Sequence, residues 1–422
     1  MRTITLNEQQ QREVEILTRL QAEALDVATA AELLGVSTRQ VRRRRAQFRQ
    51  AGMAGVLHGN TGCTPANRTD ADLVARILVL AGPGGKYHDL NGCHLHELLA
   101  REEQIVIGRS TLDRLLKQAG LRQPAKTAPP VHRRRRLRRP AEGMLLQIDS
   151  SPFAWLEERG AMADLIGAID DATGKVLFLH FRPSEDQVGY LLLLRSIAQG
   201  YGLPMSIYHD RHTILRSPKQ ATLEEQLAGQ PPMSQVQRVM AELGIESIAA
   251  GSPQAKGRIE RLWSTLQDRL TKELRLAGSS DLEQANAFLP GFMERYNVRF
   301  AQEPQDPQPA WVPLPTDLDL PYYFAIRETR KVRADHCIRF AGQLLQLLPG
   351  PQDPSLVAQT VTVHIVPEGD CYVYHDKRRI AHQPVAAPQA RPVPPTDAAL
   401  PTAQPSPPQR SAKQRAWLFG QH

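Results

Sequence analysis

The sequence predicts a multidomain protein with an all-α N-terminal region, a central α/β region and a small C-terminal β-barrel. Its 422 residues exceed the usual size of one domain. Helical periodicity fills much of residues 1–122, whereas apolar strand-like runs alternate with helices from about residue 143. The hydrophobic share of 41% suffices for packed cores, so the composition excludes wholesale disorder.

Charge and targeting signals narrow the class of protein. Residues 1–140 hold 24 basic and 13 acidic residues, whereas the rest of the chain holds 28 basic and 31 acidic ones. This asymmetry indicates a polyanionic partner, most often nucleic acid, although attraction to phosphate alone is not sequence-specific. No run of about 18 apolar residues occurs, and the N-terminus has no apolar signal core. We therefore expect a cytoplasmic protein with no membrane partner.

The four cysteines lie far apart in the sequence and predict neither a disulfide framework nor a zinc site. Cys93, His94 and His96 are near neighbours, but no second cysteine pair completes a tetrahedral ligand set. We expect isolated thiols.

The first 50 residues predict a helix-turn-helix. Residues 7–26 have the spacing of an amphipathic helix, Gly35 supplies a left-handed turn, and Ser37 with Gln40 forms a capping box for the next helix. That helix, from residue 39 to about 50, would present its first residues to base edges and its arginines to phosphates. The alternative is a solvated basic helix. The predicted DNA contacts are Arg39, Gln40, Arg42, Arg43, Arg44 and Arg45.

Residues 70–122 repeat this pattern and lead into a basic linker. A helix at 70–80 is followed by a glycine-rich loop and by a later helix that Ser110, with Asp113 in its first turn, is expected to cap. Like charges would keep the linker, residues 123–140, from folding alone, which suits an arm that follows DNA, with a solvated spacer as the alternative. The predicted DNA contacts here are Arg133, Arg134, Arg135 and Arg136.

The composition changes at residue 143 to an α/β order. Two of the predicted strands, Met144–Asp149 and Met205–Asp210, end in an aspartate. The other predicted elements are strands at 164–170, 175–181 and 245–248, helices at 185–200 and 234–243, a polar insertion at 214–234, and a long helix opening near Ser252. Glu260 lies about 100° around that helix from Ile259, at the edge of its apolar stripe.

Three carboxylates from these elements could meet at one edge of the sheet. Asp149, Asp210 and Glu260 would repel one another without cations, and oxygen-only ligands suit Mg²⁺, or Mn²⁺ as the alternative. Two such ions about 3.5–4 Å apart can activate a water or hydroxyl and stabilise the leaving oxygen of a phosphodiester. The sequence therefore predicts Asp149, Asp210 and Glu260 as catalytic residues and ligands of two Mg²⁺ ions.

Each acid also has a structural interpretation. Asp149 could cap a strand end, Asp210 could pair with the neighbouring Arg211, and Glu260 could pair with Lys256 on an exposed face. Asp170 and Asp171 lie in a hairpin turn, where aspartate commonly makes local hydrogen bonds, so we interpret both as structural.

At these residues the chain resembles the integrase-type DDE transposases of bacterial insertion sequences, in the retroviral-integrase superfamily. The matching blocks are Gln147–Ser150, Tyr208–Asp210 and Ser252–Arg261, the last resembling the S-P-x-x-x-G-x-x-E-R block around the family's catalytic glutamate. The His58–Asn60 stretch after the helix-turn-helix resembles the ISNCY group. One departure is Arg211-His212 after the second aspartate, where many relatives have Asn-Gly.

The resemblance implies an RNase H-like catalytic core in which Asp149, Asp210 and Glu260 bind the two metal ions. It implies binding to double-stranded DNA at the element ends and the target, with Lys256 and Arg258 as further contacts. It also implies a homo-oligomer on DNA and a bacterial, nucleoid-associated location. If the alignment slipped, Glu224 or Glu225 would be rivals for one metal ligand.

The expected domains follow from these patterns. They are a helix-turn-helix domain (1–66), a second one (67–122), the basic linker (123–140), the RNase H-like core (141–300), a small β-barrel (325–383) and a proline-rich disordered tail (384–422). The expected function is a transposase that binds its terminal inverted repeats, cleaves a strand with metal assistance and joins the 3′-hydroxyl to target DNA. The alternatives are a DNA-binding regulator with an inactive core and a nuclease for RNA–DNA hybrids.

Overall fold

The structure, a computed structural model, describes residues 6–57, 68–122, 136–210, 212–215, 232–249, 257–350 and 355–385. The chain divides at about residue 126 into two compact units, which we describe separately. Across the residues that the structure describes, no helix combines the length and the apolar character needed to cross a membrane.

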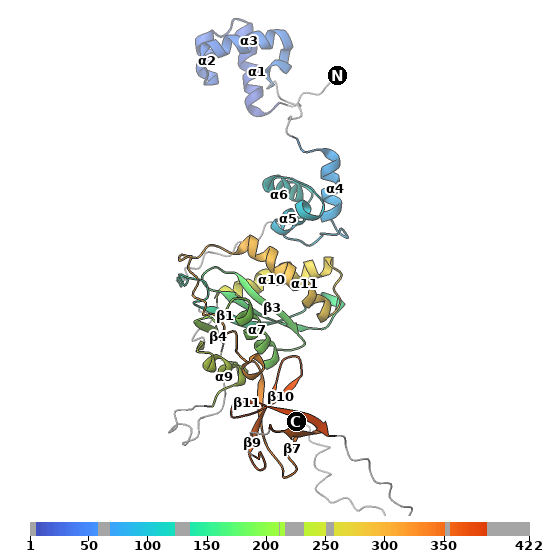
Figure 1. Cartoon of the computed structure of the whole chain (residues 1–422). Helices are drawn as coiled ribbons and strands as arrows, with labels where there is room; N and C mark the ends of the chain where they lie inside the picture. The colour runs from blue at the N-terminus through green and yellow to red at the C-terminus, as the bar shows by residue number, and fades with distance from the viewer. Residues whose placement is uncertain are drawn as a thin grey trace, which may run out of the picture. The chain divides into compact units, whose positions relative to one another are not determined.

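The first three helices of the N-terminal unit contain the predicted turn (Figure 1). They are α1 (Glu8–Gln21), α2 (Val27–Leu34) and α3 (Thr38–Ala51), followed by the short 3₁₀ helix η1 (Gly52–Val56). Gly35 ends α2 in the left-handed region at φ 63°, and Ser37 with Gln40 forms the capping box of α3, so both predictions are confirmed. The first helix is shorter than predicted, because the chain turns at Glu23 (φ 56°) before Asp26 caps α2.

The second half of this unit contains α4 (Ala71–Ala81), α5 (Gly92–Glu102) and α6 (Arg109–Gln118). The prediction that Ser110 caps the last helix is wrong: Gly108 is the N-cap, without a side-chain hydrogen bond, and Ser110 lies inside the first turn. The buried side chains of Ile105 and Ile107 hold the segment before the helix in an extended conformation as far as Gly108, and the helix begins at the next residue.

The second unit is built on a five-stranded mixed sheet. Its strands are β1 (Leu146–Phe153), β2 (Ala163–Asp170), β3 (Val176–Arg182), β4 (Ser206–His209) and β5 (Glu246–Ala249), in the order β3-β2-β1-β4-β5. The first three strands are antiparallel, whereas β4 pairs parallel with β1 and β5 pairs parallel with β4. The expectation that the first strand ends at Asp149 is wrong, because β1 continues to Phe153, which pairs with Ala163.

Helices cover both faces of this sheet (Figure 1). One core joins α7 (Gln187–Gly200) and α9 (Gln235–Glu242) to Leu146 and Ile148 of β1. The other joins α10 (Gly257–Leu276) and α11 (Leu282–Phe300) to alternate residues of β2 and β3. Because side chains alternate along a strand, Gln147, Asp149 and Ser151 face the α10 side.

The open edge of the sheet is covered by two asparagines of α11. The Asn286 side chain accepts from the Phe181 amide (2.7 Å) and donates to its carbonyl (3.1 Å). Asn297 does the same for Val176, with both distances 2.8 Å. The backbone of β3 is therefore satisfied at both ends, which removes pairing sites that an exposed edge strand offers.

The C-terminal sheet is antiparallel and nearly closed, close to the predicted barrel at 325–383. The short helix α12 (Leu320–Tyr323) precedes six strands in the order β6-β9-β10-β11-β8-β7, and Arg330 of one edge strand donates to the Arg339 carbonyl of the other (3.2 Å). The strands are β6 (Ile326–Lys331), β7 (Cys337–Phe340), β8 (Gln343–Leu348), β9 (Thr360–Ile365), β10 (Cys371–His375) and β11 (Arg378–Val385). β11 thus extends two residues into the segment expected to be a tail.

Ion pairs attach this small sheet to the α/β layer. Arg327 of β6 pairs with Glu242 of α9 (2.6 Å), and Arg195 of α7 pairs with Glu368. Arg238 of α9 donates to the Ala325 carbonyl at 2.6 Å. These contacts fix the sheet against α7 and α9.

Several predictions concern segments outside the described residues. They are the His58–Asn60 stretch, Arg133–Arg135, most of the insertion at 214–234, Lys256, and the tail from residue 386 onward.

Candidate active site

Strand β1 presents a row of polar side chains to helix α10. Gln147 accepts from the Ile259 amide at 3.2 Å, Asp149 accepts from the Trp263 indole at 3.0 Å, and the Ser151 hydroxyl accepts from Gln267 at 3.2 Å. The strand residues are two apart and the helix residues four apart, so one turn of α10 matches one pleat repeat of β1. This match places the start of α10 beside Asp149.

Asp149 is half-buried, and its position depends on a glycine opposite it. Asp149 pairs in register with Gly167 of β2. A Cβ at Gly167 would come within 2.7 Å of the Trp263 ring and 2.9 Å of Leu179, so only glycine leaves room for the indole. The indole N–H then donates to the carboxylate Oδ2 of Asp149.

Asp210 lies level with Asp149 on the neighbouring strand. The parallel register pairs Leu146 with Ile207 and Gln147 with Tyr208 and ends there, and Asp149 and Asp210 each lie two residues beyond its last pair. The charges of both aspartates act on Glu185, so the two carboxylates lie in the same region of the fold. The Asp210 carboxylate accepts from the His212 amide at 3.0 Å, which holds the turn after β4.

Glu260 lies in the first turn of α10, between the two positions that bond to β1. Its side chain is exposed. Among the described residues, no group of three His, Cys, Asp or Glu side chains is arranged to hold a metal ion. The structure thus brings Asp149 and Asp210 together and places Glu260 on the adjoining helix, without gathering all three.

A carboxylate that the sequence analysis missed, Glu185, faces the two aspartates. It precedes α7 and accepts a hydrogen bond from the buried Tyr190 hydroxyl at 2.6 Å, with His212 Nδ1 at 3.9 Å from its other oxygen. Burial raises the pKa of Glu185, and the charges of Asp210 and Asp149 raise it further, against the opposing effects of Tyr190 and His212. In the sequence Glu185 adjoins the helix cap Asp186 and resembles capping chemistry, so only the fold reveals it.

The two aspartates of the hairpin turn have different roles. Asp170 accepts from the amide and the hydroxyl of Thr173, which is the local bonding that the sequence predicts, and also from the amide of the distant Gly143. Burial raises the pKa of Asp170. Asp171, also buried, bonds to distant residues instead.

Asp171 attaches the end of the basic linker to the core. Its carboxylate pairs with Arg136, with Arg258 Nε of α10 at 3.2 Å, and accepts from the Arg139 amide at 2.9 Å and from Gln147 at 3.0 Å. The described end of the linker is therefore bound to the core rather than being a solvated spacer.

The arginines of α3 are not equivalent. Arg39, Gln40, Arg42 and Arg43 are exposed, as the DNA-contact prediction requires. The remaining two lie closer to the core of the unit: Arg44 pairs with Glu13 of α1 at 2.8 Å, and Arg45 is half-buried.

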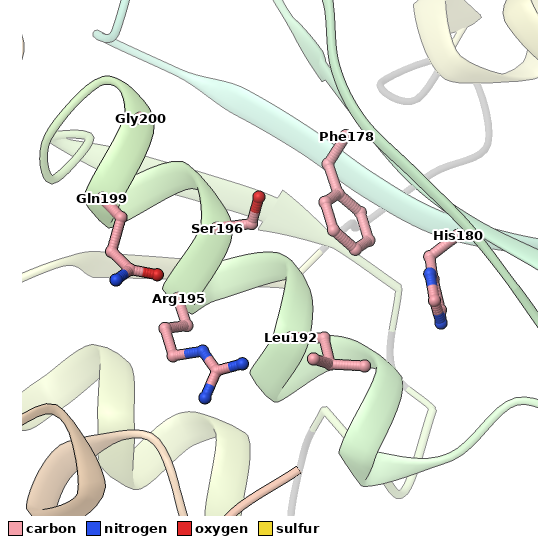
Figure 2. Close-up of a pocket in the computed structure, with 7 residues that line it drawn as sticks. All are labelled: Phe178, His180, Leu192, Arg195, Ser196, Gln199 and Gly200. Atoms are coloured by element: carbon pink, nitrogen blue, oxygen red, sulfur yellow. The ribbon is translucent and has the colours of Figure 1, made fainter. Parts of the chain in front are cut away.

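A cavity of about 560 Å³ lies between β3 and α7, and its lining contains no carboxylate. Figure 2 shows Phe178 and His180 of the strand facing Leu192, Arg195 and other residues of the helix. Burial lowers the pKa of His180. A divalent cation has no suitable ligands there, so the candidate site remains the aspartate pair beside α10.

Comparison with known proteins gives a close relative. The chain is 36% identical over 370 residues to a protein of Sinorhizobium fredii (strain NBRC 101917 / NGR234) named "Putative transposase y4bF", covering 87% of this chain and 79% of the relative. The chain belongs to the transposase family. A second transposase, that of insertion sequence IS1202 from Streptococcus pneumoniae, is 27% identical over 83% of this chain and 82% of its own length. No family model matches this transposase.

Among solved structures, a chain of the simian T-cell lymphotropic virus intasome in complex with PP2A regulatory subunit B56 gamma aligns with 71% of the transposase and 100% of its own length. The TM-score is 0.29 and the identity 16%, and at that score the likeness supports no further statement.

Proposed function

We propose that this transposase binds the terminal inverted repeats of its insertion sequence, cleaves a DNA strand and joins the freed 3′-hydroxyl to target DNA. The observation that carries the proposal is the parallel pairing of β1 with β4, which supports Asp149 and Asp210 as neighbours beside α10, the helix that bears Glu260. The sheet order β3-β2-β1-β4-β5 supports an RNase H-like core at 141–300.

We assign two divalent cations, Mg²⁺ or Mn²⁺, to Asp149, Asp210 and Glu260. The donor set fits, because carboxylate oxygens are the ligands that these hard cations prefer. When bound, two such ions supply charge that activates an attacking oxygen and stabilises a leaving one. The chain's own part is to hold the carboxylates: the Trp263 indole orients Asp149, and the His212 amide orients Asp210.

We assign DNA recognition to the N-terminal unit. The exposed residues at the start of α3, Arg39, Gln40, Arg42 and Arg43, would enter a major groove. Arg136 and Arg258, which meet at Asp171, and the neighbouring basic residues of the linker would contact DNA near the core. Joining two DNA ends requires at least two copies, so we propose a homo-oligomer on DNA.

The test uses labelled duplexes from the two ends of the DNA element that carries this gene. Wild-type protein should bind these duplexes, which a gel mobility shift measures, and in the presence of Mg²⁺ it should nick them and join their ends to other DNA. Glu260→Gln should bind the duplexes with the same affinity as the wild-type protein but neither nick nor join them. Glu294→Gln is the matched control, because Glu294 is also exposed but lies on α11.

Two outcomes would contradict the proposal. Strand joining by Glu260→Gln would remove Glu260 from the site. Binding without any metal-dependent nicking by the wild-type protein would favour a DNA-binding regulator with an inactive core, consistent with the three acids not being gathered among the described residues.

A further inference from the structure

A cavity of about 200 Å³ lies beside α10, at the edge of the core that α10 and α11 form with the sheet. Its walls come from α10, the end of α11, the β2–β3 turn and the linker, and they combine three arginines with two aromatic rings. These residues are Arg138, Arg258, Arg261, Tyr296 and Phe300. Neither the carboxylate pair nor Glu260 lines this cavity, so the catalytic proposal leaves it unassigned.

The cavity has an excess of positive charge. Arg136 and Arg258 pair with the buried carboxylate of Asp171, Arg138 donates to the Asp171 backbone carbonyl, and Arg261 lies close by. Burial lowers the pKa of Arg258, and the other arginines lower it further, against the attraction of Asp171. Within the described residues, Arg258 and Arg261 bond only through Nε, so their outer nitrogens are available to an anion.

The aromatic wall is partly exposed. The rings of Tyr296 and Phe300 lie 4.6 Å apart at the end of α11, and 37% of Phe300 is exposed. The Arg269 guanidinium lies 4.9 Å from the centre of the Phe300 ring, a cation–π contact. Aromatic faces beside arginines are the combination with which proteins bind unpaired bases and their phosphates.

We propose that this cavity binds one unpaired nucleotide of the DNA, with its base against Tyr296 and Phe300 and its phosphate on Arg258 and Arg261. The volume admits a single base ring but not a base pair. This inference rests on the proposed function, since it takes DNA as the ligand.

The cavity lies on the flank of α10 opposite to Glu260. Arg261 is about 100° around the helix from Glu260, and the other α10 residues of the lining, Arg258, Leu262 and Thr265, are about 140–160° away. A strand leaving Glu260 would reach the cavity after about one helix diameter, roughly 10 Å. Unpairing one nucleotide and rotating it out of the base stack into the cavity would free the neighbouring strand to reach the carboxylates of the candidate active site.

The test measures the affinity of the full chain for two probes in EDTA. The first probe is a 30-base-pair duplex with one central bulged nucleotide, and the second is the same duplex without the bulge. Wild-type protein should bind the bulged duplex about tenfold more tightly, as expected for stacking of one base. Phe300→Leu keeps an apolar side chain but removes the ring, so it should lose this preference while binding the plain duplex unchanged.

Two controls separate the cavity from other sites. Tyr201→Leu removes another aromatic side chain with 37% exposure, stacked on Trp311 elsewhere in the unit, and should keep the preference. A bulge that carries an abasic site should lose the preference with wild-type protein, which tests the base contact without any protein variant.

Equal binding of the two duplexes, an unchanged preference in Phe300→Leu, or tight binding of the abasic bulge would each overturn the proposal. The last result would leave a phosphate-binding site only. Because the assay contains no divalent cation and no cleavage step, its outcome is independent of whether the chain nicks and joins DNA.

Discussion

Gly167→Ala tests how the fold positions Asp149. The new Cβ would lie 2.7 Å from Trp263 and 2.9 Å from Leu179, well inside ordinary contact distance, so the indole must move. Overpacking of this kind costs about 1–3 kcal/mol of unfolding free energy. Displacing the indole also breaks its hydrogen bond to the Asp149 carboxylate, a charge-assisted bond of about 1.5–3 kcal/mol. We expect a total loss of about 2.5–6 kcal/mol.

A double-mutant cycle with Trp263→Phe tests whether the cost of Gly167→Ala depends on the indole. The smaller phenylalanine ring lacks the indole atom nearest the new Cβ, so Gly167→Ala should cost at least about 1 kcal/mol less in that background. Urea unfolding followed by far-UV circular dichroism measures all four proteins without relying on tryptophan fluorescence. Additive costs, within about 0.5 kcal/mol, would refute the contact between Gly167 and Trp263 as the reason for glycine here.

The remaining predictions concern the ion pairs of Asp171, the sheet edge at β3 and the junction with the C-terminal sheet. Asp171→Asn leaves two arginines without their buried partner, so we expect a loss of about 3 kcal/mol and faster trypsin cleavage at 136–139; unchanged cleavage would contradict the docked linker. Asn297→Ala leaves the Val176 amide and carbonyl unpaired, which should cost about 1–3 kcal/mol and speed hydrogen exchange of that amide; unchanged exchange would count against the edge cover. Burial, with neighbouring arginines, lowers the pKa of His364 to about 4. The unfolded chain therefore takes up a proton below pH ~6.5 while the folded chain does not, so the free energy of unfolding falls as the pH drops from about 6.5 toward 4. The loss is at most about 3 kcal/mol before solvent screening. Urea unfolding at pH 7.5 and 5 should show this loss in the wild type but not in His364→Gln, and equal losses in both would exclude the histidine.

Local patterns in the sequence predicted the elements well. The capping box of Ser37 and Gln40 and the left-handed Gly35 depend on residues only a few positions apart, and the structure has both. The prediction that Ser110 is the N-cap was wrong because it used the local pattern alone. The burial of Ile105 and Ile107 determines where the helix begins, and Gly108 therefore takes the N-cap position.

Features that depend on distant pairing could not be predicted. Asp149 was recognised as an acid in a strand, but its indole donor comes from residue 263 and the space for that donor from Gly167. Glu185 was missed for the same reason, because only the packing of α7 brings it toward the aspartates. Asp171 follows its neighbour in a turn, yet its partners lie 24 to 87 residues away along the chain.

The most direct test of the account is the position of Mn²⁺, located by anomalous X-ray scattering in crystals of the full chain with DNA. We predict one ion bonded to the carboxylates of Asp149 and Asp210, and a second about 3.5–4 Å away that Glu260 also binds. An ion held by Glu185 with Glu260 remaining in solvent, or no ion beside the aspartate pair, would contradict the assignment.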